Sequence, residues 1–292
     1  MSGPATTRPP IPGPRPPSAQ PTNSGPPKTA KPEASRPIGI SRGRITTGQK
    51  IGIFGPGGVG KTELCSLLEQ VGIIPVFADV EDSTKFLDVL RADPSPATLE
   101  ELRAFLWTVP TMQDVGAIVL DSATKAEELC IAWTLANVKH PDKPDKPIRS
   151  IEDYGWGKGY TFAFETFLLI LGDLDACARA GKHVMLTMHD CTANVPNPRG
   201  EDFLRYEPRL QSPPSGKGSI RHRVKEWLDH LFFVGFDTFV DETGKARPGA
   251  VRTIYTNEQP TFWAKSRSLE GFIPYKRGNP ELWRKLFNLE NS

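Results

Sequence analysis

One segment constrains the fold of this chain more than any other: residues 55–62 match the phosphate-binding pattern G-x-x-x-x-G-K-[ST] in full. The pattern follows the apolar run Ile51–Phe54 and leads into Glu63–Leu68, so it lies between a predicted strand and a predicted helix. Glycines let successive backbone N–H groups point at one anion, and the helix N-terminus adds partial positive charge. The alternative, a glycine-rich turn with an unrelated lysine, is disfavoured by this strand–loop–helix context.

The residues of the loop have distinct expected roles. Lys61 is expected to reach the β- and γ-phosphates of ATP, and the Thr62 hydroxyl is expected to be a ligand of Mg²⁺. ATP and Mg²⁺ are therefore the predicted cofactors. The predicted nucleotide-binding residues are Gly55, Pro56, Gly57, Gly58, Val59, Gly60, Lys61, Thr62 and Glu63.

The first 44 residues differ in composition from the rest of the 292-residue chain. They are mainly Pro, Ser, Thr, Gly and basic residues, with too few apolar side chains to form a core. We therefore predict a disordered, proline-rich basic tail over 1–44 and one α/β domain over 45–292. Two roles for the tail remain open, a solvated leader without a specific partner and an interaction arm.

Composition narrows the setting in which the protein works. The net charge of +2 is close to neutral and identifies no partner by itself. No apolar run reaches the ~18 residues needed to cross a bilayer, so no membrane partner is expected. The cysteines Cys65, Cys130, Cys177 and Cys191 lack C-x-x-C spacing, which argues against a zinc site or a disulfide framework and fits a reducing cytoplasm.

Predicted strands alternate with predicted helices along the folded part, which favours a mostly parallel sheet covered on both faces. The predicted strands are 51–54, 74–78, 105–109, 117–120, 183–188 and 231–235, followed by a C-terminal β-hairpin of 251–255 with 262–265. The predicted helices are 61–71, 82–91, 97–104, 122–138, 159–180 and 220–229, and 139–157 and 190–219 are predicted loops. Ligands of such sheets bind at the carboxyl ends of the strands.

Acidic residues follow two of these strands. Asp121 ends the run 118–120, where a carboxylate behind a phosphate loop is expected to hold Mg²⁺; a helix N-cap is a compatible second role. Glu81 is our candidate for the general base that orients the attacking water. Asp79 and Asp82 are competing candidates, and Asp82 or Ser83 also suits the cap of the next helix.

His189 ends the strand 183–188, where it is expected to sense the γ-phosphate. The alternative is a histidine whose hydrogen bonds are satisfied by a neighbouring carboxylate.

The order of these features resembles the RecA-like ATPase core. Asp79-Val80-Glu81 is similar to the segment that carries the family's catalytic glutamate, and Leu120-Asp121-Ser122 is similar to its Walker B segment. His189 stands where the family has its glutamine sensor. The chain also resembles phage-encoded nucleotide-binding proteins of the RecA-like single-strand-annealing type over about 45–275, through the stretches DYGWGKGY, KHVMLTMH and EDFLRYEP at 153–160, 182–189 and 201–208.

The resemblance implies a three-layer P-loop NTPase that hydrolyses ATP, assembles into a ring or filament, and acts on single-stranded DNA in phage recombination or annealing. A phage-encoded protein would act in the host cell cytoplasm. Two other functions remain open: a nucleotide-dependent DNA-annealing module with negligible turnover, and a small-molecule phosphotransferase. The sequence offers no convincing lid arginine or acceptor pocket for the last.

The resemblance also implies that two segments, 190–220 and 139–160, face DNA. The first carries basic residues interleaved with aromatic ones, a composition that suits single strands, although its acids dilute the charge. A solvated insertion or lid is the alternative. The basic residues are Arg199, Arg205, Arg209, Lys217, Arg221 and Arg223.

A second pair of cations comes late in the chain. Lys265 and Arg267 resemble the pair that RecA-like assemblies insert into the neighbouring subunit's ATP site, which would give both residues a catalytic role. An ordinary charged hairpin end is the alternative.

Overall fold

The computed structural model describes residues 39–40, 42–43, 47–145, 147–198, 200–240 and 246–289, without the side chains of 237–240 and 246–250. The chain divides into two units, Met1–Arg44 and Ile45–Ser292. Most of the predicted disordered tail lies outside the described residues. The following description concerns the second unit.

A mainly parallel eight-stranded sheet forms the centre of this unit, which confirms the α/β class expected from the sequence. β1 pairs in parallel with β5 and β8, and β4 pairs in parallel with β5 and β2, whereas β8–β9 and β9–β10 are antiparallel. The strand that precedes the phosphate loop is thus separated from the Asp121 strand by β5 alone. In sheet order the strands are β10 (Phe272–Tyr275), β9 (Ala246–Tyr255), β8 (His230–Val240), β1 (Lys50–Phe54), β5 (His183–Met188), β4 (Ala117–Asp121), β2 (Pro75–Asp79) and β3 (Leu90–Arg91).

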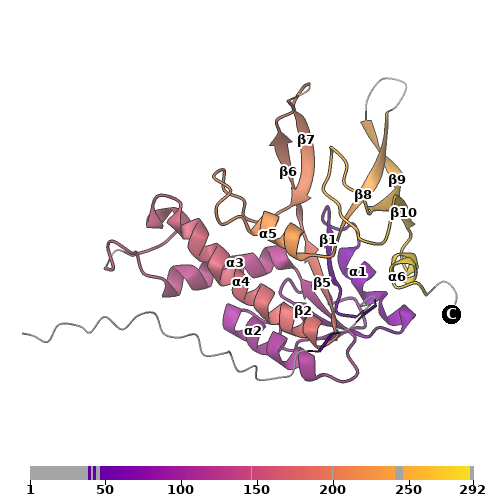
Figure 1. Cartoon of the computed structure of the whole chain (residues 1–292), viewed down its shortest axis with the longest axis horizontal. Helices are drawn as coiled ribbons and strands as arrows, with labels where there is room; N and C mark the ends of the chain where they lie inside the picture. Colours follow the sequence, from indigo (N-terminus) through magenta and orange to yellow (C-terminus); the bar gives the residue numbers. More distant parts are fainter. Residues whose placement is uncertain are drawn as a thin grey trace, which may run out of the picture. The chain divides into compact units, whose positions relative to one another are not determined.

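Helices cover both faces of the sheet and complete three layers (Figure 1). Successive strand residues alternate between the two cores: Phe54 packs with one helical group and Ile53 with the other. One layer contains α2 (Leu99–Thr108), α3 (Ala123–Asn137), α4 (Lys158–Arg179) and α5 (Ile220–Trp227); the other contains α1 (Lys61–Ser66) and α6 (Glu281–Leu286). None of the helices in the described part of the chain is long and apolar enough to span a bilayer.

Two predictions between β2 and β4 are wrong. Phe105–Val109 was expected as a strand, but most of it ends α2, because Leu102, Leu106 and Val109 recur at helical spacing and are buried. Residues 82–91 form no helix. Their first residues fold back onto the Asp79 carboxylate and the segment ends in the short strand β3.

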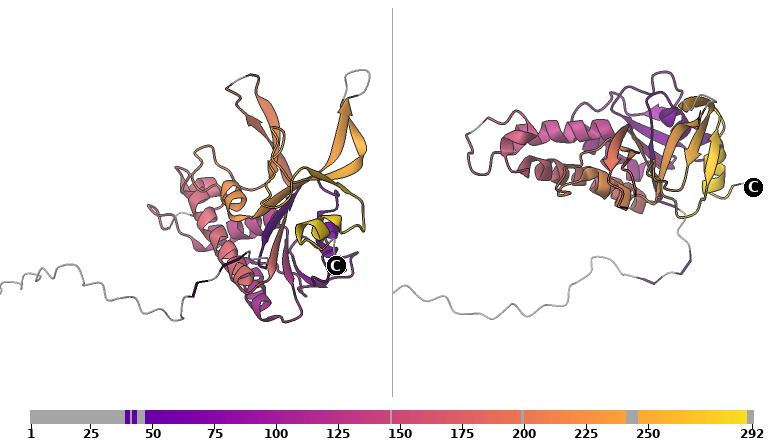
Figure 2. Two further views of the ribbon diagram at one scale, coloured as in Figure 1. Left: turned by 45° about the vertical axis from the view of Figure 1, so that its right-hand side comes forward. Right: turned by 90° about the horizontal axis from the view of Figure 1, so that it is seen from above.

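Two further predictions need correction. The expected loop 190–219 contains β6 (Asp190–Val195) and β7 (Phe203–Pro208), which pair as a separate antiparallel sheet. The C-terminal hairpin exists, but its strands are β8 and β9 with β10 beside them, whereas 262–265 makes only isolated bridges. Both hairpins extend to the same side, beyond the helices (Figures 1 and 2).

Candidate nucleotide-binding site

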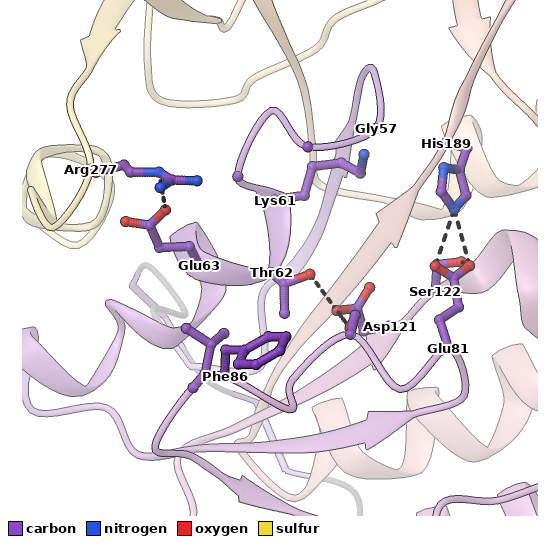
Figure 3. Close-up of a pocket in the computed structure, with 14 residues that line it drawn as sticks. Gly57, Lys61, Thr62, Glu63, Glu81, Phe86, Asp121, Ser122, His189 and Arg277 are labelled. Atoms are coloured by element: carbon purple, nitrogen blue, oxygen red, sulfur yellow. Dashed lines mark hydrogen bonds and ion pairs between the residues drawn. The ribbon is translucent and has the colours of Figure 1, made fainter.

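The phosphate loop lies at the carboxyl end of β1 and borders a pocket of about 560 Å³ (Figure 3). Gly58 and Gly60 have φ of 74° and 99°, a region that suits glycine, and a Cβ at Gly55 would lie 2.1 Å from the Val234 carbonyl oxygen. The sharp turn therefore requires its glycines. Five parts of the chain line the pocket: the loop and α1 (Gly57, Gly58, Gly60, Lys61, Thr62, Glu63), the β2–β3 connection (Glu81, Ser83, Phe86, Leu87), the end of β4 with the residue after it (Asp121, Ser122), His189 after β5, and Arg277 after β10.

Lys61 points across the loop that precedes it. Its Nζ donates to the carbonyl oxygens of Gly55, at 2.8 Å, and Pro56, at 3.0 Å. Burial lowers the pKa of Lys61, although the charges of Asp121, Asp190 and Glu81 act in the opposite direction. A bound phosphate would replace carbonyl oxygens with full negative charges, which are stronger acceptors for the ammonium group.

The two predicted Mg²⁺ ligands are in direct contact. Thr62 Oγ1 donates to Asp121 Oδ2 at 2.6 Å, and the Asp121 residue is only 3% exposed. Ser83 Oγ donates to the same oxygen at 2.7 Å, and Thr187 Oγ1 donates to Oδ1. These hard oxygen donors fit Mg²⁺, which is bound by one or two carboxylates together with phosphate oxygens. The described residues contain no cluster of three or more Asp, Glu, His or Cys side chains that could hold a metal without phosphate.

Glu81 and His189 are in contact at one side of the pocket (Figure 3). His189 Nε2 lies 3.1 Å from both carboxylate oxygens of Glu81, and Ser122 Oγ donates to Glu81 Oε1. The predicted base and the predicted sensor are therefore in direct contact. The alternative expectation for His189 was a hydrogen bond to a neighbouring carboxylate, and Glu81 is such a carboxylate. The sensor role of His189 stays a prediction.

The competing carboxylates have other partners. Asp79 accepts hydrogen bonds from the backbone N–H groups of Glu81, Ser83 and Thr84. The hydroxyl groups of Ser83 and Thr84 also donate to it. Burial raises the pKa of Asp79, but these hydrogen bonds outweigh that effect and lower it. Asp82 is exposed and pairs with Lys85 at 3.0 Å. Of the three candidates, Glu81 alone lines the pocket.

Lys265 and Arg267 do not approach the pocket of their own chain. Lys265 Nζ donates to the carbonyl oxygens of Leu228, at 2.6 Å, and Lys225, at 3.2 Å, near the C-terminus of α5. Arg267 is exposed and lies 3.4 Å from Asp229, whose backbone N–H donates to the Lys50 carbonyl at the start of β1. Both cations therefore lie toward the end of the sheet away from the phosphate loop, and their action on a neighbouring subunit stays a prediction.

The two predicted DNA segments present exposed groups. In 139–160, Trp156 stands between Gly155 and Gly157 and is 99% exposed. In 190–220, Leu204 and Tyr206 of β7 are exposed large side chains, and Arg209 and Lys217 are exposed cations, as is Arg223 just beyond. Arg205 and Arg221 instead bind the buried Glu207, and Arg199 lies outside the described residues.

A second pocket, of about 550 Å³, lies between these two segments and α3. Glu127 lines it, and its Oε1 accepts a hydrogen bond from the Gln211 backbone N–H at 2.6 Å. Burial raises the pKa of Glu127 to about 7, against the hydrogen bond of Gln211 and the charges of Arg221 and Arg209. Glu128 raises it slightly further.

We expect Glu127 to reduce stability as the pH rises. A folded-state pKa above the unfolded value means that the folded chain binds more protons between about pH 4.5 and 7, so stability is lost across that window. Glu127→Gln should therefore stabilise the protein by an amount that grows with pH to on the order of 3 kcal/mol. Urea unfolding at pH 5 and pH 8 measures the difference, and an equal effect at both pH values would contradict the prediction.

Several residues that line the first pocket or hold its Asp121 carboxylate were not predicted from the sequence. Ser83 was expected only as a candidate helix cap and Thr187 only as a strand residue, whereas both donate hydrogen bonds to Asp121. Phe86 lies in the predicted helix 82–91, but in the structure the residue is 99% exposed and lines the pocket. Arg277 was missed because it is far from the phosphate loop in sequence. It directly follows β10, a strand that was not predicted, since 262–265 was expected to pair with 251–255 instead.

Comparisons with known proteins identify the family of this chain. The sequence profile of the AAA domain family matches residues 47–268. A solved KaiC-like protein from the hyperthermophilic archaeon Pyrococcus horikoshii OT3 is similar at 12% identity and a TM-score of 0.42, over 80% of this chain and 87% of that one. None of the curated proteins matches. Because the profile spans most of the chain, including the phosphate loop, Glu81, Asp121 and His189, this protein belongs to the AAA domain family of nucleotide-binding P-loop proteins.

Proposed function

We propose that this protein is a Mg²⁺-dependent ATPase that acts on single-stranded DNA in recombination or annealing, in a phage context. The observation that carries the ATPase proposal is the convergence of Lys61, the Thr62–Asp121 pair and Glu81 on one pocket. Family membership supports nucleotide binding. An ATPase assay with and without Mg²⁺ and single-stranded DNA tests the proposal, and a purified protein that neither binds nor hydrolyses ATP would reject it.

The arrangement suits an in-line attack of water on the γ-phosphorus. The Glu81 carboxylate would orient the water, while Ser122 and His189 hold that carboxylate in place. Lys61 would stabilise negative charge on the transferred phosphoryl group. Mg²⁺ on Thr62 and Asp121 would neutralise charge on the β- and γ-phosphates.

A second candidate function is a DNA-annealing module that binds ATP with negligible turnover. It is favoured by the hydrogen bonds that Glu81 already makes to Ser122 and His189, because these compete with a nucleophilic water. A single-turnover measurement with excess protein separates the two candidates. Hydrolysis that is stimulated by DNA supports the ATPase, and DNA binding that needs ATP but not its hydrolysis supports the annealing module.

The DNA proposal is supported by the exposed groups of the two segments. Trp156 offers an uncovered ring on which a base can stack, and Tyr206 and Leu204 add exposed surface on β7. Lys217 and Arg223 are exposed cations that suit phosphates. The hairpin β6–β7 also follows His189 directly, so the DNA segment and the nucleotide pocket share one connection.

We expect the affinity for single-stranded DNA to fall with salt and to depend on Lys217 and Arg223. Each cation that neutralises a phosphate contributes about 0.7 to the slope of log affinity against log salt. The double change Lys217→Ala with Arg223→Ala should therefore lower the slope by up to about 1.4. Fluorescence anisotropy with labelled oligonucleotides and an ATP analogue measures it, with the exposed Arg179→Ala on α4 as control. An unchanged slope would favour the lid interpretation of 190–220.

Self-assembly is the remaining part of the proposal. Phe86 and Leu90 leave exposed apolar surface beside the nucleotide pocket, which a neighbouring subunit would cover. Arg267 is exposed and available to a neighbour.

If each site is completed by a neighbour, ATPase activity per molecule should rise with protein concentration. Arg267→Ala should lower the activity of the assembled protein without weakening nucleotide binding. Rates measured across a dilution series, together with sedimentation velocity, test this. Constant specific activity from a species that stays monomeric throughout the series would contradict self-assembly.

A further inference from the structure

The C-terminal segment from β10 to α6 is fixed onto the phosphate loop and α1. Tyr275 Oη donates to the Gly60 carbonyl oxygen at 3.0 Å, and Trp283 Nε1 donates to the Leu64 carbonyl oxygen at 2.7 Å. Tyr275 and Trp283 are buried in the same core as Val59 and Leu64. The backbone between β10 and α6 is therefore held at a defined place beside the loop.

This segment brings Arg277 to the nucleotide pocket. Arg277 Nε lies 3.1 Å from Glu63 Oε2, and the Gly278 backbone N–H donates to Glu63 Oε1 at 3.2 Å. The Arg277 side chain is 69% exposed and lines the pocket with Glu63 (Figure 3). A guanidinium group has five N–H donors, so the exposed N–H groups of Arg277 can bind a second acceptor while Nε stays near the Glu63 carboxylate.

The position within the pocket indicates which part of a nucleotide Arg277 would meet. Glu81 and His189 lie on one side of Thr62, and Glu63 and Arg277 lie on the other (Figure 3). The γ-phosphate must lie on the Glu81 side, because the proposed base acts there, and the loop backbone cradles the α- and β-phosphates. Arg277 therefore faces the α-phosphate end of the nucleotide.

We propose that Arg277 binds the α-phosphate of the nucleotide held by its own chain, with Glu63 as its resting partner. The guanidinium fork matches phosphate oxygens, and it offsets the Glu63 carboxylate that would otherwise stand beside the anionic ligand. The proposal rests on the nucleotide binding proposed above. It makes Arg277 a binding residue and not a catalytic one, since it lies away from the γ-phosphate.

The test compares nucleotide affinity with turnover. Arg277→Ala should weaken the binding of both ADP and ATP by about 10- to 100-fold, as expected for the loss of a charge-assisted hydrogen bond, with little change in kcat at saturating ATP. Arg277→Lys should retain part of the affinity. Lys276→Ala, an exposed neighbour on the same connection, is the control, and the melting temperature of each variant shows whether the segment stays docked.

Three results would overturn the proposal. One is wild-type affinity for ADP in Arg277→Ala. Another is a loss confined to ATP, which would place Arg277 at the γ-phosphate. The third is wild-type affinity in the double variant Glu63→Gln with Arg277→Ala, which would reduce Arg277 to a counter-charge for Glu63. A wild-type protein that binds no ATP would instead reject the proposed function, so the two failures are distinguishable.

Discussion

Lys61→Ala is expected to reduce ATP turnover to below about 1% of the wild-type rate, because one removed transition-state donor costs roughly 3–4 kcal/mol. Lys61 holds its ammonium group within the phosphate loop, at 2.8 Å from the Gly55 carbonyl. No other lysine lines the pocket among the described residues, so none is placed to substitute. Steady-state phosphate release with saturating ATP and Mg²⁺ measures the effect.

The fold of the Lys61→Ala variant should remain intact. Lys61 donates hydrogen bonds only to carbonyl oxygens of its own loop and carries the cost of burial. The buried Asp121 carboxylate keeps its hydroxyl donors Thr62, Ser83 and Thr187 when the lysine is removed, so it is not left without hydrogen-bond partners. Circular dichroism and thermal unfolding check this, and Lys125→Ala, at a half-exposed lysine on α3 paired with Glu128, is the matched control. A folded Lys61→Ala protein with unchanged hydrolysis would remove the basis of the ATPase proposal.

The contiguous parts of the site were predictable from sequence because each depends on local chain geometry. A phosphate loop needs its glycines, its lysine and its threonine within eight residues, and a buried parallel strand reads as an apolar run with its polar residue at the end. These rules located Lys61, Thr62, Asp121 and His189 around one pocket. They also predicted the central strands β1, β2, β4 and β5.

The parts that failed depend on contacts between distant residues. Residues 82–91 had helical composition, but the Asp79 carboxylate binds the backbone of Ser83 and Thr84 and holds a turn there. Phe105–Val109 is apolar enough for a strand, and its helical state follows from packing of Leu102 and Leu106 against the sheet. β10 was missed because a long connection separates it from β9, and the composition of that connection does not predict that the two strands pair.

Arg277 is a residue of the functional site that sequence patterns could not predict, for the same reason. Its charge is unremarkable in sequence, and only the packing of Tyr275 and Trp283 on α1 brings it beside Glu63. Ser83 and Thr187 reach Asp121 in the same way, from two other strand ends. Residues that reach a site only through tertiary packing have no characteristic spacing in the sequence, whereas the residues of the phosphate loop do.

Glu81→Gln is expected to slow hydrolysis by about 10²–10⁴-fold, the usual contribution of a positioned base, while ATP binding and its Mg²⁺ dependence persist. Glutamine keeps the size of the side chain and an acceptor for Ser122, so the pocket should keep its shape. Single-turnover hydrolysis and nucleotide affinity, measured on the same preparation, separate the chemical step from binding.

The decisive comparison is with Asp79→Asn. Asp79 is buried and its two oxygens accept hydrogen bonds from Glu81, Ser83 and Thr84, so its replacement should chiefly lower the melting temperature. Glu81→Gln should instead lower the rate of ATP hydrolysis strongly and leave the melting temperature nearly unchanged. If Asp79→Asn instead stays stable and loses the rate while Glu81→Gln keeps it, Asp79 is the base. In that case the turn around Asp79 must open when the nucleotide binds, because its carboxylate has no approach to the pocket while those hydrogen bonds persist.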